Sequence, residues 1–231
     1  MENLAKIISI DWKWVEAHLS ARERLKEISE DSTKEAALST LKEALDIAKS
    51  KAAPKISFAE KKIVEFRPGS FELEEGVTLS SRELSSHIKG ANRILAFLVT
   101  IGRDVEEAAT SYMNSGDHLL GYLLDRAGSF AVESLAKNTE EGLRRNLLLE
   151  NLSVSMRFSP GYCDWPIEEQ FKLALIIDFG NAGVTLTKSC MMIPKKSISA
   201  VVGIGPGGLF TKIKSPCILC NMKVCDYRRK D

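Results

Sequence analysis

The chain has 231 residues, 44% of them hydrophobic and 27% charged, which is enough for one large domain or two small ones with a buried core. Its 32 Lys and Arg against 31 Asp and Glu give a formal charge of +1, so the balance favours neither nucleic acid nor an anionic membrane as a partner. The first residues lack the apolar segment of a signal peptide, and no apolar run approaches the roughly 20 residues of a membrane span. We therefore expect a cytoplasmic protein without nucleic-acid or membrane partners.

The N-terminal region is predicted to form a helical hairpin. Asp11 can cap a helix over residues 12–31, where apolar side chains recur at helical spacing. Ser32 and Thr33 open a second helical stretch, which ends before Pro54. These two helices are expected to pack as an antiparallel pair.

Strands are predicted to follow. The apolar period changes towards two over 56–66 and 70–79, with a Pro-Gly turn at 68–69 between them. A short helix is expected over 80–88, and the apolar run at 93–102 predicts a well-buried strand.

The second half predicts helices and strands in runs rather than in strict alternation. Helices are expected over 104–114, 117–149 and 166–179, and strands over 153–159, 185–194 and 197–205. This order favours an α+β fold, an antiparallel β-sheet flanked by helices with an N-terminal helical hairpin. We expect a single domain over 1–231, with the hairpin at 1–53, the α+β core at 54–214 and a cysteine-containing tail at 215–231.

The segment "GIGPGG" has the glycine spacing of a dinucleotide-binding turn at Gly203, Gly205 and Gly208. Such a turn must lead into a helix, whereas here Pro206 interrupts and basic and β-branched residues follow. A glycine-rich hairpin or mobile loop is the preferred interpretation.

The tail contains Cys217, Cys220 and Cys225, close enough for three thiolates to hold zinc or an iron–sulfur cluster if Cys163, Cys190 or an outside group completes the set. Free thiols are the alternative, since only one C-x-x-C pair is present. The isolated histidines are interpreted as solvated helix positions or caps and are assigned no role: His18, His87 and His118.

The stretch "RFSPGYCDWP" is the strongest candidate for a ligand site. Arg157 offers a planar fork for a carboxylate, and the turn at 160–161 exposes backbone amides. The Tyr162 ring can stack on a purine or face a sulfonium, and Glu133, on the flank of an apolar helical stripe, can receive an ammonium group. The alternative is a surface ion pair for Arg157 and core packing for Tyr162.

These residues resemble a known family. Arg157, Gly161 and Tyr162 occupy the three fixed places of the Arg-x-x-x-Gly-Tyr signature of the S-adenosylmethionine-binding activation domain of cobalamin-dependent methionine synthase. A second segment, "GVTLTKSCMMIPKKSISAVVGIG", resembles the closing strand and loop of that family through Leu186, Thr187, Ser189, Met192, Pro194, Ser197 and Ser199. The resemblance covers roughly residues 91 to 229. Cys163 stands where the motif commonly has proline, a departure that bears on the turn after Tyr162 and on how the ligand is seated.

The resemblance implies a role in reductive reactivation of cobalamin. Inactive Co(II) takes one electron from a donor such as a flavodoxin or ferredoxin, and the resulting Co(I) takes the methyl group from S-adenosylmethionine. Arg157 would hold the ligand's carboxylate, Glu133 and Asp11 would lie near its ammonium group, and backbone around Gly161 and Tyr162 would meet the adenosine. No general base is needed, because the sulfonium already activates the methyl group and positioning does the rest.

The chain is too short for the catalytic and cobalamin-carrying modules, so the resemblance implies a free-standing activation component that acts as a methyltransferase on another protein. That client is a cobalamin-binding methionine synthase or another corrinoid protein. The alternatives are a non-enzymatic clamp or chaperone for such a protein, and a redox metalloprotein that uses the tail cysteines. The methyl-donor hypothesis requires the Arg157 guanidinium to face an open cleft beside Tyr162, and burial of that group in the interior or in ion pairs, with no hollow beside Tyr162, would argue for abandoning it.

Overall fold

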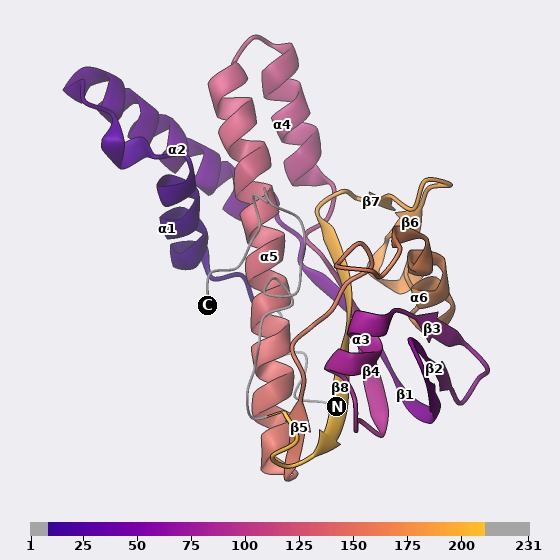
Figure 1. Ribbon diagram of the computed structural model, residues 1–231. Coiled ribbons are helices and arrows are strands. Elements are labelled where there is room, and N and C mark those ends of the chain that lie inside the picture. The colour runs from indigo at the N-terminus through magenta and orange to yellow at the C-terminus, as the bar shows by residue number, and fades with distance from the viewer. Residues whose placement is uncertain (1–8, 211–231) are drawn as a thin grey trace.

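A six-stranded sheet forms the centre of the part of the chain that the structure describes, residues 9–210 of a computed structural model (Figure 1). Its strands span Lys55–Arg67 (β1), Ser70–Leu73 (β2), Thr78–Ser80 (β3), Arg93–Thr100 (β4), Leu152–Val154 (β5) and Ser197–Pro206 (β8). They lie in the order β3-β2-β1-β4-β8-β5, and every neighbouring pair is antiparallel. A separate two-stranded hairpin consists of Thr185–Leu186 (β6) and Met192–Ile193 (β7).

Helices cover both faces of the sheet. They span Trp12–Arg22 (α1), Asp31–Lys51 (α2), Arg82–His87 (α3), Asp104–Asn114 (α4), His118–Leu149 (α5) and Gln170–Ile176 (α6), with short 3-10 turns at Leu25–Glu27 (η2), Ile167–Glu169 (η3) and Gly180–Ala182 (η4). Helices α1, α2, α4 and α5 share one hydrophobic core with one sheet face, and α3 and α6 share a second core with the other. The predicted α+β class, with an antiparallel sheet flanked by helices, is confirmed. Within residues 9–210, no helix has both the length and the apolar character needed to cross a membrane.

Strand β4 lies between the two cores. Phe97 and Val99 belong to the core of the long helices, whereas Ala96 and Leu98 belong to the core of α3 and α6. Successive side chains of a strand point to opposite faces, so a strand covered on both faces is apolar at nearly every position. This confirms the prediction of a well-buried strand in this segment.

The N-terminal helices begin at two different kinds of cap. The Asp11 carboxylate accepts a hydrogen bond from the backbone N–H of Trp14 at 3.0 Å, as the sequence predicts. Helix α2 instead starts after Glu30, whose carboxylate accepts hydrogen bonds from the hydroxyls of Ser32 and Thr33. These hydroxyls therefore point back to Glu30, and α2 begins earlier than the sequence predicts.

The glycines near the end of β8 do not form a nucleotide-binding turn. Gly203 lies within β8, where an added Cβ would be 2.8 Å from the Cβ of Ile88. Glycine at this position thus allows the chain after α3 to approach the sheet closely. Residues 207–210 form a turn, which agrees with the loop interpretation for the last glycines of the segment.

Five predicted elements are shorter in the structure than their apolar patterns indicate. Segment 70–79 divides into β2 and β3, 153–159 contains only β5, 166–179 contains η3 and α6, 185–194 is the β6–β7 hairpin, and 12–31 contains α1 and η2. In the first case the chain reverses at Gly76, which has φ +77°. Such reversals leave the spacing of apolar residues intact, so the periodicity alone does not reveal them.

Candidate functional site

The segment Arg157–Trp165, called the motif loop below, is a tight turn packed on the second core. The backbone N–H of Gly161 donates to the carbonyl of Trp165 at 2.8 Å, and the N–H of Trp165 donates to the carbonyl of Tyr162 at 2.9 Å. Gly161 has φ +89°, a conformation that glycine adopts without steric cost. The Tyr162 ring packs edge-on against Phe158, with 6.0 Å between the ring centroids. The turn thereby fixes the backbone on both sides of Tyr162.

Cys163 gives this turn a backbone that proline could not adopt. Its φ is +50°, in the left-handed region, whereas the proline ring holds φ near −65°. The departure of this chain from the usual motif is therefore coupled to a different turn immediately after Tyr162.

Asp164 fastens the motif loop to the start of α3. Its carboxylate accepts hydrogen bonds from the Ser81 hydroxyl at 2.5 Å and from the backbone N–H groups of Arg82 at 2.8 Å and Glu83 at 3.2 Å. Desolvation on its own raises the pKa of this carboxyl group, but the hydrogen bonds outweigh it and the net pKa is lowered. The carboxylate is therefore the form that holds the loop on α3.

Replacing Asp164 with alanine should lower the free energy of unfolding by about 1 kcal/mol, the usual effect of losing a helix cap. Because the folded pKa is lowered, this contribution is complete above the unfolded pKa of about 3.9 and disappears as the pH falls through the folded value. Urea unfolding of both proteins at about pH 7 and about pH 2.5 measures it. The two should differ at neutral pH and converge in acid; an equal difference at both pH values would contradict this role of the carboxylate.

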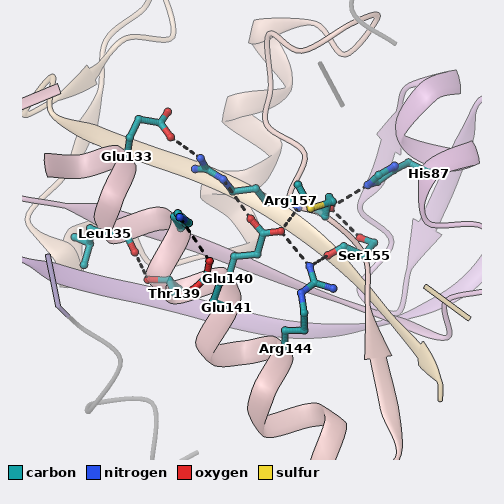
Figure 2. Close-up of polar contacts among 11 residues, drawn as sticks. His87, Glu133, Leu135, Thr139, Glu140, Glu141, Arg144, Ser155 and Arg157 are labelled. Carbon is teal, nitrogen blue, oxygen red and sulfur yellow. Dashed lines mark hydrogen bonds and ion pairs between the residues drawn. The ribbon is translucent and has the colours of Figure 1, made fainter. Parts of the chain in front are cut away.

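The Arg157 side chain lies inside the protein, in ion pairs with α5 (Figure 2). It is 1% exposed. Its Nη2 donates to Glu133 Oε2 at 2.5 Å, and its Nε lies 3.6 Å from Glu140 Oε2. The Arg157 guanidinium, which was predicted to bind a ligand's carboxylate, thus forms ion pairs with two carboxylates of the protein itself.

Glu140 joins α5 to the chain that leads into the motif loop. This carboxylate accepts a hydrogen bond from the backbone N–H of Arg157 at 3.3 Å and another from Arg144 Nη2 at 3.2 Å. Arg144 also donates to the backbone carbonyls of Val154 at 2.5 Å and Ser155 at 3.3 Å. A buried carboxylate needs such partners because an unpaired charge in the interior is strongly destabilising.

The Arg157 guanidinium stays charged and keeps spare hydrogen-bonding capacity. Burial alone lowers its pKa, but the charges of Glu133, Tyr162 and Glu140 and the hydrogen bond that Arg157 donates to Glu133 raise the net pKa above the ordinary value. Its Nε and Nη1 are buried, and neither has a hydrogen-bond partner among residues 9–210. Buried donors are almost always satisfied, so an unpaired one beside an ion pair is compatible with a ligand that completes the set.

A hollow of about 180 Å³ adjoins this ion pair on the side of Glu133, whose side chain is 22% exposed. Its lining residues are Ser129, Val132, Glu133, Lys195, Lys196 and Ile198. A larger hollow of about 410 Å³ along α2 contains none of the predicted site residues. The expectation of an exposed Arg157 in an open cleft beside Tyr162 is therefore wrong for this structure, because the carboxylates of α5 enclose the guanidinium and the hollow lies beside Glu133.

Asp11 lies beside the part of α5 that contains Glu133. Its backbone N–H donates to the hydroxyl of Ser134, the residue after Glu133, at 2.9 Å. Its carboxylate caps α1 through Trp14. The start of α1 is thus held close to Glu133, although the two residues are 122 positions apart in the sequence.

The second motif, near the C-terminal end of the described chain, supports the backbone rather than presenting ligands. The Thr187 hydroxyl accepts a hydrogen bond from the N–H of Met191 inside the β6–β7 hairpin. Ser197 donates to the carbonyl of Pro194, which follows a cis peptide bond, and Ser199 donates to the side chain of Gln170. Thr187 and Ser197 thus stabilise the backbone of this segment, and Ser199 joins β8 to the first residue of α6.

His87, to which the sequence assigned no role, contacts the residue before Arg157. Its Nε2 donates to the carbonyl of Met156 at 3.1 Å, and its ring lies 5.7 Å from that of Phe158. Burial lowers the pKa of His87, and the opposing effects of the Met156 carbonyl and the Glu140 charge do not offset it. The neutral imidazole is therefore the form that fits the folded protein.

Because the folded pKa of His87 lies below its unfolded value of about 6.5, protonation favours the unfolded chain. The free energy of unfolding should decrease as the pH falls through about 6.5 and level off below the folded pKa. His87→Gln should reduce this loss of stability when unfolding is followed from about pH 7.5 to about pH 5. His118→Gln, at an exposed position, is the control and should keep the pH dependence of the unsubstituted chain.

Sequence reasoning missed Glu140 and Arg144. A signal for them exists, because Glu133 and Glu140 are seven residues apart and Arg144 follows four later, spacings that place them along one side of a helix. Two carboxylates and a guanidinium in that row indicate a helix side that faces polar partners.

The proposed metal ligands Cys217, Cys220 and Cys225 lie outside the described residues. Within residues 9–210, no group of three or more His, Cys, Asp or Glu side chains is arranged to hold a metal ion. Cys163 is partly buried, and Cys190 is buried.

Comparisons with known proteins bear on both the sequence motif and the fold. A family model described as "Vitamin B12 dependent methionine synthase, activation domain" matches residues 84–213. A crystal structure of the MetH reactivation domain bound to AdoHcy has a TM-score of 0.58 at 18% identity, over 89% of this chain and 76% of that chain. No curated protein matches the sequence. At that identity, the solved structure supports the fold alone.

Proposed function

The chain belongs to the family of vitamin B12-dependent methionine synthase activation domains, and on this premise we propose that it binds S-adenosylmethionine and methylates reduced cobalamin held by a separate protein. The observation that carries the proposal is the family match, because residues 84–213 include Glu133, Arg157, Gly161 and Tyr162. The solved structure with the same fold holds AdoHcy, the product that remains once S-adenosylmethionine has given up its methyl group. A ligand of that class is therefore the first to test.

Binding requires a change at the Arg157–Glu133 pair. The ligand's carboxylate would take the place of Glu133 on Nη2 and would also meet Nη1, which has no partner within residues 9–210. A guanidinium and a carboxylate joined by two charge-assisted hydrogen bonds form one of the stronger polar contacts in proteins. Glu133, released at the edge of its hollow, would then pair with the ligand's ammonium group.

Asp11 is proposed as the second group near that ammonium. The backbone hydrogen bond from Asp11 to Ser134 holds the start of α1 against α5. Because Asp11 caps α1 through its carboxylate, its effect on the ligand would be that of a nearby negative charge.

The turn at Gly161 and Tyr162 would hold the adenosine and sulfonium end. Gly161 has φ +89°, so a residue with a Cβ would be strained at this point of the turn. An aromatic ring beside a sulfonium contributes about 0.5 to 2 kcal/mol, depending on desolvation. The protein then only orients the methyl group towards Co(I), whose electron pair forms the new bond as the sulfonium becomes a neutral thioether.

An anaerobic reaction tests this function. The chain is mixed with a cobalamin-loaded methionine synthase or another corrinoid protein, a low-potential reductant such as reduced flavodoxin or ferredoxin, and S-adenosylmethionine. Methylcobalamin absorbance should appear only when all four components are present. Failure to form it with every client, together with no binding of S-adenosylmethionine in calorimetry, would refute the proposal.

A second candidate function is favoured by the enclosed Arg157. A guanidinium already paired with Glu133 and facing Glu140 fits a chain that clamps or chaperones a corrinoid protein without binding a methyl donor. Titration with S-adenosylmethionine distinguishes the two, since the clamp binds the corrinoid protein and gives no heat with the nucleoside.

A further inference from the structure

The two carboxylates that face the Arg157 guanidinium differ in exposure and in partners (Figure 2). The Glu133 side chain is 22% exposed and lines the hollow. The Glu140 side chain is 6% exposed and accepts hydrogen bonds from the Arg157 backbone and from Arg144. Moving Glu133 would leave a carboxylate near solvent, whereas moving Glu140 would break several buried contacts. Glu133 is thus the exchangeable carboxylate and Glu140 the fixed one.

We propose that Glu140 is a positioning residue that sets the orientation of the Arg157 guanidinium, so that Nη1 and Nη2 face the carboxylate of the amino-acid end of the ligand. This inference rests on the proposed function, because it assigns to Glu140 a part in recognising that ligand. Glu140 lies on the Nε side of the guanidinium, at 3.6 Å, and holds the backbone N–H of the same residue. The Glu140 carboxylate therefore contacts both the backbone N–H and the guanidinium group of Arg157.

Arg144 keeps Glu140 in that place. It donates to Glu140 and, through the same guanidinium, to the carbonyls of Val154 and Ser155. The chain entering the motif loop and the carboxylate that orients Arg157 are consequently fixed to each other. Because the Arg157 side chain is constrained in this way, it loses little conformational entropy when its N–H groups bind a ligand.

The variant Glu140→Gln tests this role, because it keeps the size of the side chain and a hydrogen-bond acceptor but removes the charge. Calorimetry should show the Kd for S-adenosylmethionine raised about tenfold or more, since the guanidinium loses the negative charge that it faces at 3.6 Å. The Kd for methylthioadenosine, which lacks the amino-acid carboxylate, should stay within about twofold. Equal weakening of both ligands, or no change for S-adenosylmethionine, would overturn the proposal.

Glu141→Gln is the matched control. Glu141 is the next residue of α5, its side chain is 50% exposed, and it pairs with Lys137 at 3.9 Å. This variant removes the same charge from the same helix and should bind both ligands as the unsubstituted chain does. Thermal unfolding of both variants shows whether each is folded at the temperature of the titration.

A measurement without ligand separates this inference from the proposed function. The Nε proton of Arg157, assigned in ¹⁵N NMR spectra by its loss in Arg157→Lys, should exchange slowly with water because the side chain is 1% exposed. Exchange should be at least about tenfold faster in Glu140→Gln and unchanged in Glu141→Gln. Unchanged exchange in Glu140→Gln refutes the role of Glu140, whereas absence of S-adenosylmethionine binding by the unsubstituted chain refutes the proposed function.

Discussion

Replacing Arg157 with alanine is expected to abolish the binding of S-adenosylmethionine and to lower the free energy of unfolding by about 3 to 5 kcal/mol. The guanidinium is 1% exposed, pairs with Glu133 and faces Glu140, so its removal leaves a buried carboxylate with one cation fewer. The cost of stranding a buried charge exceeds the net value of the pair itself. Urea unfolding and calorimetry measure the two effects.

A double variant separates binding from stability. Arg157→Met combined with Glu140→Gln removes the cation together with the more buried of the two carboxylates that it faces, leaving side chains of similar size. Part of the lost stability should return, because position 140 then carries no buried charge, while Glu133 and Arg144 each still lack one partner. Binding should not return, because no guanidinium is present for the ligand's carboxylate. If Arg157→Ala, or this double variant, binds S-adenosylmethionine as the unsubstituted chain does, then Arg157 has only a structural role.

The sequence did not predict how the residues of the candidate site pair with one another. Glu133 and Arg157 were each expected to contact the ligand, and the structure instead has them in contact with each other at 2.5 Å. The spacing of the motif indicates that a guanidinium and a carboxylate are present. It does not show that these two groups pair with each other when no ligand is bound. The same limitation hid Glu140, whose partners are a backbone N–H and an arginine four residues further along α5.

Prediction of the fold succeeded where local signals are strong. Helix α4 has the predicted bounds, and α5 begins after Asp117, whose side chain caps it. The bounds of the short elements were predicted less well, because distant residues help to define their ends. Asp164 supports the start of α3 from more than 80 positions away, and Ser199 bonds to Gln170, the first residue of α6. Contacts between residues so far apart in the sequence cannot be recognised from the pattern of residues in a short segment.

Trp165→Ala is the second substitution with a large expected effect, a loss of about 3 to 5 kcal/mol in the free energy of unfolding. Trp165 is 1% exposed, and its ring lies 6.1 Å from that of Phe158. Its indole N–H donates to Glu169 Oε2 at 3.3 Å, and the same carboxylate oxygen accepts the backbone N–H of Ser80. Truncation would open a cavity under the motif loop and remove one hydrogen bond from a buried carboxylate. Urea unfolding measures the loss.

Two controls distinguish volume from hydrogen bonding at this position. Trp165→Phe keeps a ring in the core and should recover part of the stability, with a remaining deficit of about 1 to 3 kcal/mol from the lost hydrogen bond to Glu169 and the smaller ring. Ile167→Ala changes a 44% exposed side chain of the neighbouring turn and should cost no more than about 0.5 kcal/mol.

Trp165→Ala should also weaken the binding of S-adenosylmethionine, although Trp165 lies outside the Arg157 ion pairs. Gly161 donates its N–H to the backbone carbonyl of Trp165, so a loop that loses its anchor no longer fixes the turn that precedes Tyr162. The amide of Gly161 should therefore lose hydrogen-exchange protection in this variant and keep it in Ile167→Ala. Full protection of that amide together with weakened binding would mean that Trp165 acts on the ligand by another route than the shape of the turn.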